Sequence, residues 1–166
     1  MDEKDASVAS ESALLALDTN VVNAAAGYID AADVHGASAT VAYVRGNIAA
    51  RTGHLDLAHK NFTKCLEQDP AHIRARLNRS SISMALDEGR RVLDDAEILL
   101  DLAPMLGLAR VRKGEGHMML GEWDQASKQF RHVLESAPHH THALTQLAAC
   151  YMSMDRPERA EAPLNE

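Results

Sequence analysis

The nine histidines are the side chains of this sequence that most readily bind a metal or transfer a proton near neutral pH. Three of them, His139, His140 and His142, lie close together after Pro138. Neighbouring imidazoles can bind zinc or nickel, but no carboxylate or cysteine completes a recognisable ligand set around them. The sequence therefore predicts a polar turn at these histidines, with no metal and no other cofactor.

The sequence contains no pattern typical of an enzyme active site. It lacks a glycine-rich phosphate loop and the GxSxG, HExxH and DxDxDG motifs. The segment from Lys113 to Gly116 falls inside a predicted helix, and Cys65 and Cys150 belong to no CxxC pair. We expect both cysteines to be free and to pack as small apolar residues. The prediction is a protein that is not an enzyme and has no catalytic residues.

The composition is typical of a soluble, helical domain. Of 166 residues, 46% are apolar and 25% are charged, and alanine and leucine, which favour helices, are abundant. The net charge of −7 makes nucleic acid an unsuitable partner. The N-terminus has no signal-like segment, and no apolar run approaches the about 18 residues that span a bilayer. We therefore expect no membrane span and a cytoplasmic location.

Similar residues recur at intervals of 34 along the chain. Pro70, Pro104 and Pro138 keep this spacing. Two further columns consist of small residues, and a third contains two phenylalanines. These columns are Gly46, Ser80, Gly114 and Ala148; Ala58, Val92, Ala126 and Ala160; and Phe62, Ala96 and Phe130. Such a period is typical of a solenoid built from repeated helix pairs.

The order of these columns resembles the tetratricopeptide (TPR) repeat. That repeat has an early small residue, an alanine with a phenylalanine one helical turn later, and a closing proline. The resemblance covers about residues 39–163, but two family positions differ here. The expected tryptophan is replaced by Ala42, Arg76, Arg110 and Leu144, and the expected leucine by Arg45, Arg79 and Lys113.

The resemblance implies an all-α fold, a right-handed TPR superhelix in which each repeat is an antiparallel pair of helices, A and B. The implied repeats are residues 39–72, 73–106 (degenerate), 107–140 and 141–166 (truncated). We expect the glycines to let helices A and B approach closely, Phe62 and Phe130 to fill the space between repeats, and the prolines to end each helix B. The turns between A and B are expected at 52–54, 87–89, 121–122 and 155–157.

The two ends of the array are expected to differ from the repeats. Residues 1–10 are predicted to be disordered, and residues 11–38 to form an atypical or partial helical repeat. The fourth repeat stops short of a full period, whereas a solenoid usually ends in a capping helix. Either the chain is part of a longer protein, or a partner or a second copy covers the open C-terminal end. A homo-oligomer formed through that end is therefore left open.

In TPR arrays the A helices line a concave groove that binds peptides or helices. The four predicted A helices of this chain carry eight lysines or arginines and one acid, Glu115. The groove positions that the family implies are Tyr43, Asn47, Arg51, Arg74, Asn78, Met84, Arg112, Met118, His142, Gln146 and Met152. Arginines bind carboxylates and methionines adapt to apolar side chains, which indicates an acidic or acidic-hydrophobic ligand. The alternative is a solvated surface with the methionines in the core.

A more specific version concerns heat-shock chaperones, whose C-terminal carboxylate some TPR domains hold with five polar residues. Asn47, Asn78 and Arg112 match three of these positions. Tyr43 and Leu108 stand where lysines are expected, and this difference disfavours a chaperone clamp.

We therefore expect a protein-binding scaffold or adaptor whose concave groove takes a peptide or helix of a partner protein. The alternative is an N-terminal targeting or oligomerisation module of a larger enzyme, such as a transferase or hydroxylase. Self-assembly through the C-terminal end is compatible with both.

Overall fold

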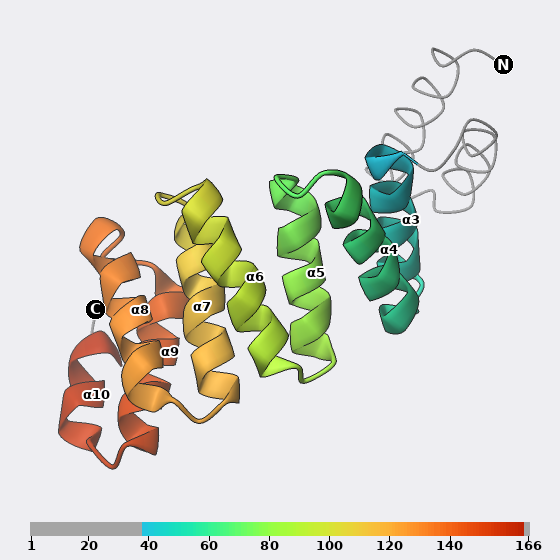
Figure 1. The fold of residues 1–166 in the computed structure, drawn as a ribbon. Helices are drawn as coiled ribbons and strands as arrows, with labels where there is room; N and C mark the ends of the chain where they lie inside the picture. The colour runs from blue at the N-terminus through green and yellow to red at the C-terminus, as the bar shows by residue number, and fades with distance from the viewer. Residues whose placement is uncertain (1–37, 165–166) are drawn as a thin grey trace, which may run out of the picture. The chain divides into compact units, whose positions relative to one another are not determined.

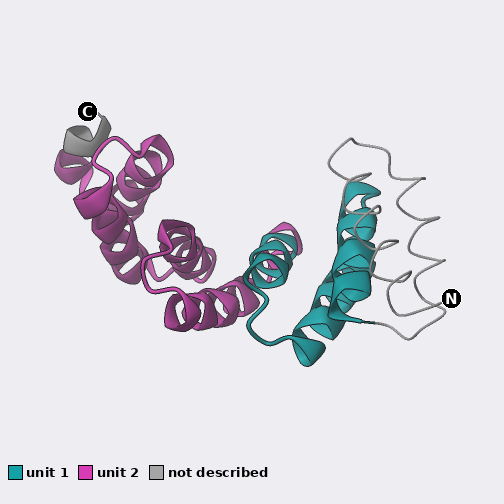
Figure 2. Ribbon diagram, turned by 90° about the horizontal axis from the view of Figure 1, so that it is seen from above, with its two compact units in different colours: residues 1–82 teal, residues 83–166 magenta. Residues whose placement is uncertain are grey.

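The computed structural model describes residues 38–164 and divides the chain into two compact units, residues 1–82 and 83–166 (Figure 2). Residues 38–164 form eight helices and contain no strand (Figure 1). The predicted all-α class, an α-solenoid of helix pairs, is confirmed. The two predicted N-terminal segments lie outside the described residues, except for Ser38. Its hydroxyl caps the first described helix by accepting a hydrogen bond from the backbone N–H of Val41, at 3.3 Å.

The helices follow one another in A and B pairs. The A helices are α3 (Ala39–Arg51), α5 (Ile73–Ala85), α7 (Gly107–Met119) and α9 (Thr141–Ser153). The B helices are α4 (Leu55–Gln68), α6 (Gly89–Leu102), α8 (Trp123–Ser136) and α10 (Pro157–Leu164). The boundary between the two units falls inside α5, so that Met84 belongs to the second unit.

Every turn from an A helix to a B helix contains one residue in the left-handed region. These residues are Gly53 (φ 78°), Asp87 (φ 59°), Gly121 (φ 73°) and Asp155 (φ 55°), again at a spacing of 34. Glycine adopts this conformation without strain, and aspartate tolerates it better than most residues. Gly89 was predicted to lie in a turn, but it is the first residue of α6. A Cβ atom there would lie 2.8 Å from Cβ of Met119, so this glycine allows α6 to start against α7.

In unit 1 the core is centred on Phe62, which is fully buried. Its ring packs on Gly46, where a Cβ atom would lie only 2.5 Å from Cε1 of Phe62. The small residue on helix A and the phenylalanine on helix B therefore fill one space together. Phe62 packs on the glycine of its own repeat. In unit 2, Phe130 also belongs to the core that α8 shares with α9 of the next repeat, as expected for a ring between repeats.

In unit 2 a phenylalanine of helix B again packs on a glycine of helix A. Phe130 is fully buried, and a Cβ atom on Gly114 would lie 2.7 Å from its Cζ. Consecutive helices of this unit, from α6 to α10, pack against each other in sequence order. The core between α7, α8 and α9 consists of Val111, Ala126, Phe130, Val133, Ala143, Leu147 and Cys150. These contacts fix the A helices α7 and α9 relative to α8.

The two cysteines are free and buried, as predicted. Burial raises the pKa of the Cys150 thiol to about 11. Burial, with a smaller effect from the charge of Asp69, raises the pKa of the Cys65 thiol to about 11 as well. Both thiols are therefore protonated near neutral pH and lack the thiolate that makes a cysteine reactive.

Candidate functional site

In unit 1 two asparagines join the A helices α3 and α5. Asn78 Nδ2 donates a hydrogen bond to Asn47 Oδ1 at 2.8 Å, and Asn47 Nδ2 donates to the backbone carbonyl of Tyr43 at 3.1 Å. Both asparagines were predicted to be groove residues. The hydrogen bond between them holds the neighbouring A helices α3 and α5 in register, and this fixes the side chains beside them.

Tyr43, another predicted groove residue, packs within unit 1. Its ring centroid lies 6.0 Å from that of Phe62 and 4.8 Å from that of His72. Nδ1 of His72 in turn accepts a hydrogen bond from the backbone N–H of Ala75, at 3.1 Å, and caps the start of α5. Tyr43 therefore links α3 to the core and to the beginning of α5.

The arginines of α5 differ in their surroundings. Arg76 is buried and donates to the carbonyl oxygen of Pro70 at 2.7 Å. Arg79 donates to Oγ1 of Thr63 at 3.2 Å. Arg74 is exposed, and no described carboxylate pairs with it. Because Arg74 and Asn78 are one helical turn apart, they lie on the same side of α5.

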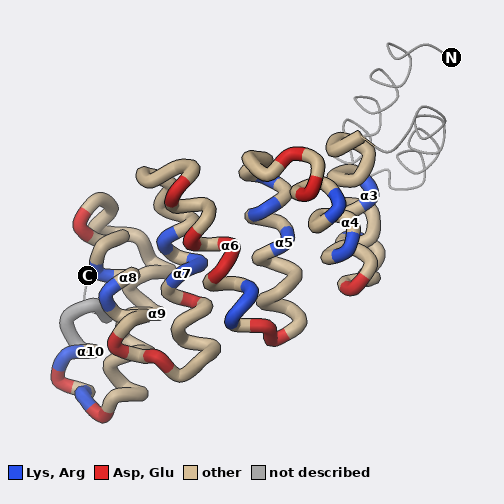
Figure 3. The backbone as a smooth tube through the Cα atoms, viewed as in Figure 1, with Lys and Arg blue, Asp and Glu red and all other residues tan. Residues whose placement is uncertain are grey.

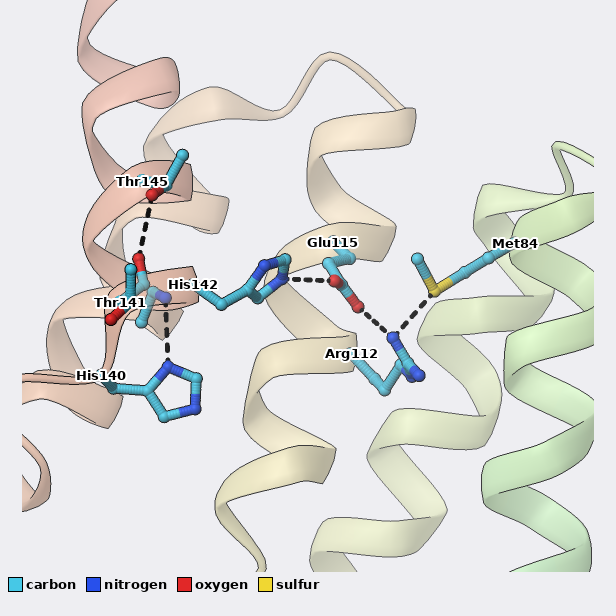
Figure 4. Close-up of polar contacts among 8 residues, drawn as sticks. Met84, Arg112, Glu115, His140, Thr141, His142 and Thr145 are labelled. Atoms are coloured by element: carbon cyan, nitrogen blue, oxygen red, sulfur yellow. Dashed lines mark hydrogen bonds and ion pairs between the residues drawn. The ribbon is translucent and has the colours of Figure 1, made fainter.

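In unit 2 two predicted groove residues, Arg112 and His142, bond to one buried acid, Glu115, and a third, Met84, contacts Arg112 (Figure 4). Glu115 is 8% exposed. Arg112 Nη1 donates to Glu115 Oε2 at 2.7 Å and also lies 3.3 Å from Sδ of Met84. His142 Nε2 donates to the other oxygen, Oε1, at 2.8 Å. Met84, Arg112, Glu115 and His142 thus form a network, the Glu115 network, that spans α5, α7 and α9.

A second cation of α7 is also paired. Nζ of Lys113 lies 3.0 Å from Oε1 of Glu97, which belongs to α6. The charged residues along the chain are marked in Figure 3. The count of eight cations against one acid was correct for the A helices, but in unit 2 carboxylates from α6 and α7 neutralise Lys113 and Arg112. The A-helix face of unit 2 is therefore less basic than the sequence indicated.

The methionine stripe divides into packed and exposed members. Met118 is half-buried against the core between α7, α8 and α9. Met152 is 60% exposed on α9, on which Gln146 is half-buried. In unit 1, Arg51 is exposed at the end of α3. The core position of the alternative interpretation therefore holds for Met118, whereas the side chain of Met152 lies at the surface.

The histidine cluster separates into different roles. Nδ1 of His140 accepts a hydrogen bond from the backbone N–H of Ala143 at 3.1 Å and caps α9, while His142 bonds to Glu115. Another histidine, His117, is half-buried, and its Nδ1 lies 2.6 Å from Oε2 of Glu122. Within residues 38–164 no three His, Cys, Asp or Glu side chains converge in a way that could hold a metal ion.

Sequence reasoning missed an apolar surface at the turn between α6 and α7. Met105 is 94% exposed, and Leu102 and Leu108 are exposed as well. A pocket of about 180 Å³ lies beside this turn, lined by Pro104, Met105, Gly107, Arg110, His132, Val133, Glu135 and Ser136. The sequence did contain a signal for this surface, because the other repeats have polar or small residues at the same positions. The positions 34 residues before and after Leu102 are Gln68 and Ser136, and those 34 residues before and after Met105 are Ala71 and His139.

Antiparallel helix pairs of this length, with a glycine on helix A packed under a phenylalanine on helix B, define the TPR class of α-solenoid. A family model described as tetratricopeptide repeat matches residues 39–72, and a second one matches residues 117–166. The chain belongs to the tetratricopeptide-repeat family.

Solved structures with the same fold include MamA, residues 41 to the end, from Desulfovibrio magneticus RS-1. Its TM-score is 0.88 at 16% identity, over 97% of this chain and 92% of that chain. A tetratricopeptide repeat protein from Parabacteroides merdae ATCC 43184 has a TM-score of 0.78 at 17% identity, over 96% and 63% of the two chains. The first TPR of Spaghetti, bound to the HSP90 peptide SRMEEVD, has a TM-score of 0.66 at 24% identity, over 71% and 94%.

These identities support the shared fold alone. No curated protein matches the sequence. None of the helices within residues 38–164 combines the length and the apolar character that crossing a membrane requires.

Proposed function

We propose that this protein-interaction scaffold binds a peptide or helix of a partner protein on its A-helix faces, and that the ligand is acidic or acidic-hydrophobic. The observation that carries the proposal is the exposed Arg74 beside the bonded asparagines of unit 1. The hydrogen bond between Asn47 and Asn78 holds α3 and α5 in register. Arg74 therefore belongs to a helix whose position relative to α3 is fixed. Such an arginine can bind a carboxylate with two parallel hydrogen bonds.

A structural neighbour supports an acidic ligand. The first TPR of Spaghetti is bound to SRMEEVD, a peptide with two glutamates and an aspartate. Tyr43 and Leu108 occupy the positions where a chaperone clamp has lysines, so we do not assign the same partner to this chain. The heptapeptide SRMEEVD is instead a suitable probe, because it combines carboxylates with the apolar methionine and valine.

The proposal is tested by titrating fluorescein-labelled SRMEEVD with the full chain and measuring fluorescence anisotropy. We expect Arg74→Glu to weaken binding at least about tenfold, since a favourable ion pair becomes a repulsion. Arg131→Glu is the matched control, because Arg131 is an exposed arginine on a B helix, α8. Equal affinities of Arg74→Glu and the wild type would exclude the A-helix face of unit 1 as the binding surface.

The natural partner is sought with the same pair of variants. A protein that the wild type and Arg131→Glu retain from a native lysate, and that Arg74→Glu loses, would be a ligand of this face. A protein retained equally by all three would bind elsewhere, and the exposed turn at Met105 would be the next surface to test.

A further inference from the structure

The Glu115 network has a consequence for which ligands the A-helix face of unit 2 can accept. Both carboxylate oxygens of Glu115 are already bonded, one to Arg112 at 2.7 Å and the other to His142 at 2.8 Å (Figure 4). Glu115 is the one acid on the A helices, and it is almost fully buried. The two groups of this face that would bind a ligand carboxylate are therefore occupied by a carboxylate of the protein itself.

From this geometry we propose that Glu115 is a specificity residue. It excludes acidic side chains from Arg112 and His142, and makes the α7 and α9 face of unit 2 a receptor for the neutral, apolar part of a ligand. This inference rests on the proposed function, in which the A-helix faces bind a peptide. It deepens that function, because it assigns the binding of ligand carboxylates to unit 1 and the binding of uncharged apolar groups to unit 2.

Electrostatics gives the reason for the exclusion. A ligand carboxylate that approached Arg112 would also come close to Glu115, which carries the same charge and cannot withdraw into solvent without losing both bonds. Like charges at such a short distance repel, and the repulsion is stronger where burial reduces solvent screening. The side chain of Arg112 is itself only 20% exposed, so little water is available to screen the approach.

The other side chains of this face are suited to an uncharged ligand. Leu108 on α7 and Met152 on α9 are exposed, and Met84 contacts Arg112 through its sulfur. Unbranched, polarisable methionines adapt to apolar side chains of different shape. In unit 1, by contrast, the exposed Arg74 has no carboxylate beside it among the described residues.

The test compares two probes on the full chain, SRMEEVD and its amide analogue SRMQQVN, by fluorescence anisotropy. Glu115→Gln keeps the size of the side chain and removes its charge. We expect it to bind SRMEEVD about tenfold more tightly than the wild type, and to bind SRMQQVN equally well within about twofold. In the double variant Glu115→Gln, Arg112→Gln the gain should disappear, because the freed guanidinium is absent.

Glu115→Asp is the matched control, since it keeps the negative charge and should give no gain. An unchanged or reduced affinity of Glu115→Gln for SRMEEVD would overturn the proposal. Should Glu115→Gln fail to fold by circular dichroism, Glu115→Met replaces it, because it also removes the charge with a side chain of similar length. Glu115→Met should show the same gain in affinity for SRMEEVD, whereas an unchanged or reduced affinity would overturn the proposal.

The failure of this inference and the failure of the proposed function are distinguishable. If the wild type binds neither probe and Arg74→Glu changes nothing, the acidic-ligand function is wrong. A gain of SRMEEVD binding in Glu115→Gln would still support the exclusion by Glu115. If Arg74→Glu weakens binding and Glu115→Gln has no effect, the proposed function stands and the role of Glu115 is wrong.

Discussion

The A helices of the two units carry similar residues in different electrostatic settings. In unit 1, α3 and the first part of α5 contain arginines and no acid, and Arg74 is exposed. In unit 2, α7 contains as many cations as α5, but Glu115 pairs with Arg112 and Glu97 pairs with Lys113. A charge count along one face of a solenoid therefore overestimates the electric field of that face, because neighbouring helices can supply the opposite charge.

The cores of the two units, by contrast, are built alike, because each contains a phenylalanine packed on a glycine. The largest effects on stability that we predict come from removing these phenylalanines. Phe62→Ala in unit 1 and Phe130→Ala in unit 2 each remove a fully buried ring that packs on a glycine. We expect each change to lower the free energy of unfolding by about 3–5 kcal/mol, measured by urea denaturation followed by circular dichroism. A loss below about 1 kcal/mol in one variant would show that the glycine–phenylalanine pair is not equally important in that unit.

The next prediction addresses the difference between the units. Glu115→Ala leaves Arg112 and His142 without their shared carboxylate, and we expect it to destabilise the protein by about 2 kcal/mol. Arg74→Ala removes an exposed side chain and should change the stability by less than about 0.5 kcal/mol. Urea denaturation of both variants decides this, and equal effects would mean that the Glu115 network contributes no more than an exposed arginine.

Each unit contains one cysteine, and the pair reports on the opening of each unit separately. Because burial raises the pKa of Cys65 and of Cys150 to about 11, neither should react with a thiol reagent such as Ellman's reagent at pH 7 in the folded protein, and both should react in urea. Mass spectrometry of the labelled peptides identifies the site. Rapid labelling of one cysteine without urea would show that its unit opens locally.

The same thiols predict how stability depends on pH. In the unfolded chain they ionise near the ordinary value of 9.0, and in the folded protein near 11. Above pH 9 the unfolded state therefore loses protons more readily, and the free energy of unfolding should fall as the pH rises from about 9 to 11. A Cys65→Ala, Cys150→Ala variant should show a smaller fall over this range, and an identical fall would assign it to other groups.

The smallest predicted effect concerns the turns. Within residues 38–164, unit 1 has Gly53 at its left-handed turn position, whereas unit 2 has Asp87 and Asp155 at two of three such positions. Asp87→Gly relieves the backbone strain but makes the unfolded chain more flexible, so we expect a gain of no more than about 0.5 kcal/mol. Thermal unfolding measures the change, and a loss above about 1 kcal/mol would indicate that the Asp87 side chain stabilises the turn.

Much of the fold could be predicted from the sequence, because the constraints that build it repeat at a spacing of 34. The starts of the A helices and the small residues opposite the phenylalanines follow from that period. The buried cysteines were predicted on a different ground, because neither belongs to a CxxC pair. The close approach of Phe62 to Gly46 of its own repeat did not follow, since a column of residues does not say which atoms a ring touches. The start of α6 at Gly89 was missed for a similar reason, because a glycine beside an acidic pair is typical of a turn.

The candidate site was less predictable than the fold. The positions of Arg112 and His142 on the A helices followed from the period, but their shared bond to Glu115 depends on side-chain conformations and on the distance between α7 and α9. The contact of Tyr43 with His72 likewise joins residues that no sequence spacing connects. The groove residues as a binding site, and a homo-oligomer through the C-terminal end, stay predictions.

The central claim is that ligand carboxylates are bound by unit 1 and excluded by unit 2. The most direct measurement is the affinity of SRMEEVD for the wild type, for Arg74→Gln and for Glu115→Gln, determined side by side by fluorescence anisotropy. We predict that Arg74→Gln weakens binding about tenfold and that Glu115→Gln strengthens it about tenfold. Binding that is unchanged in Arg74→Gln, or unchanged or weaker in Glu115→Gln, would contradict the claim.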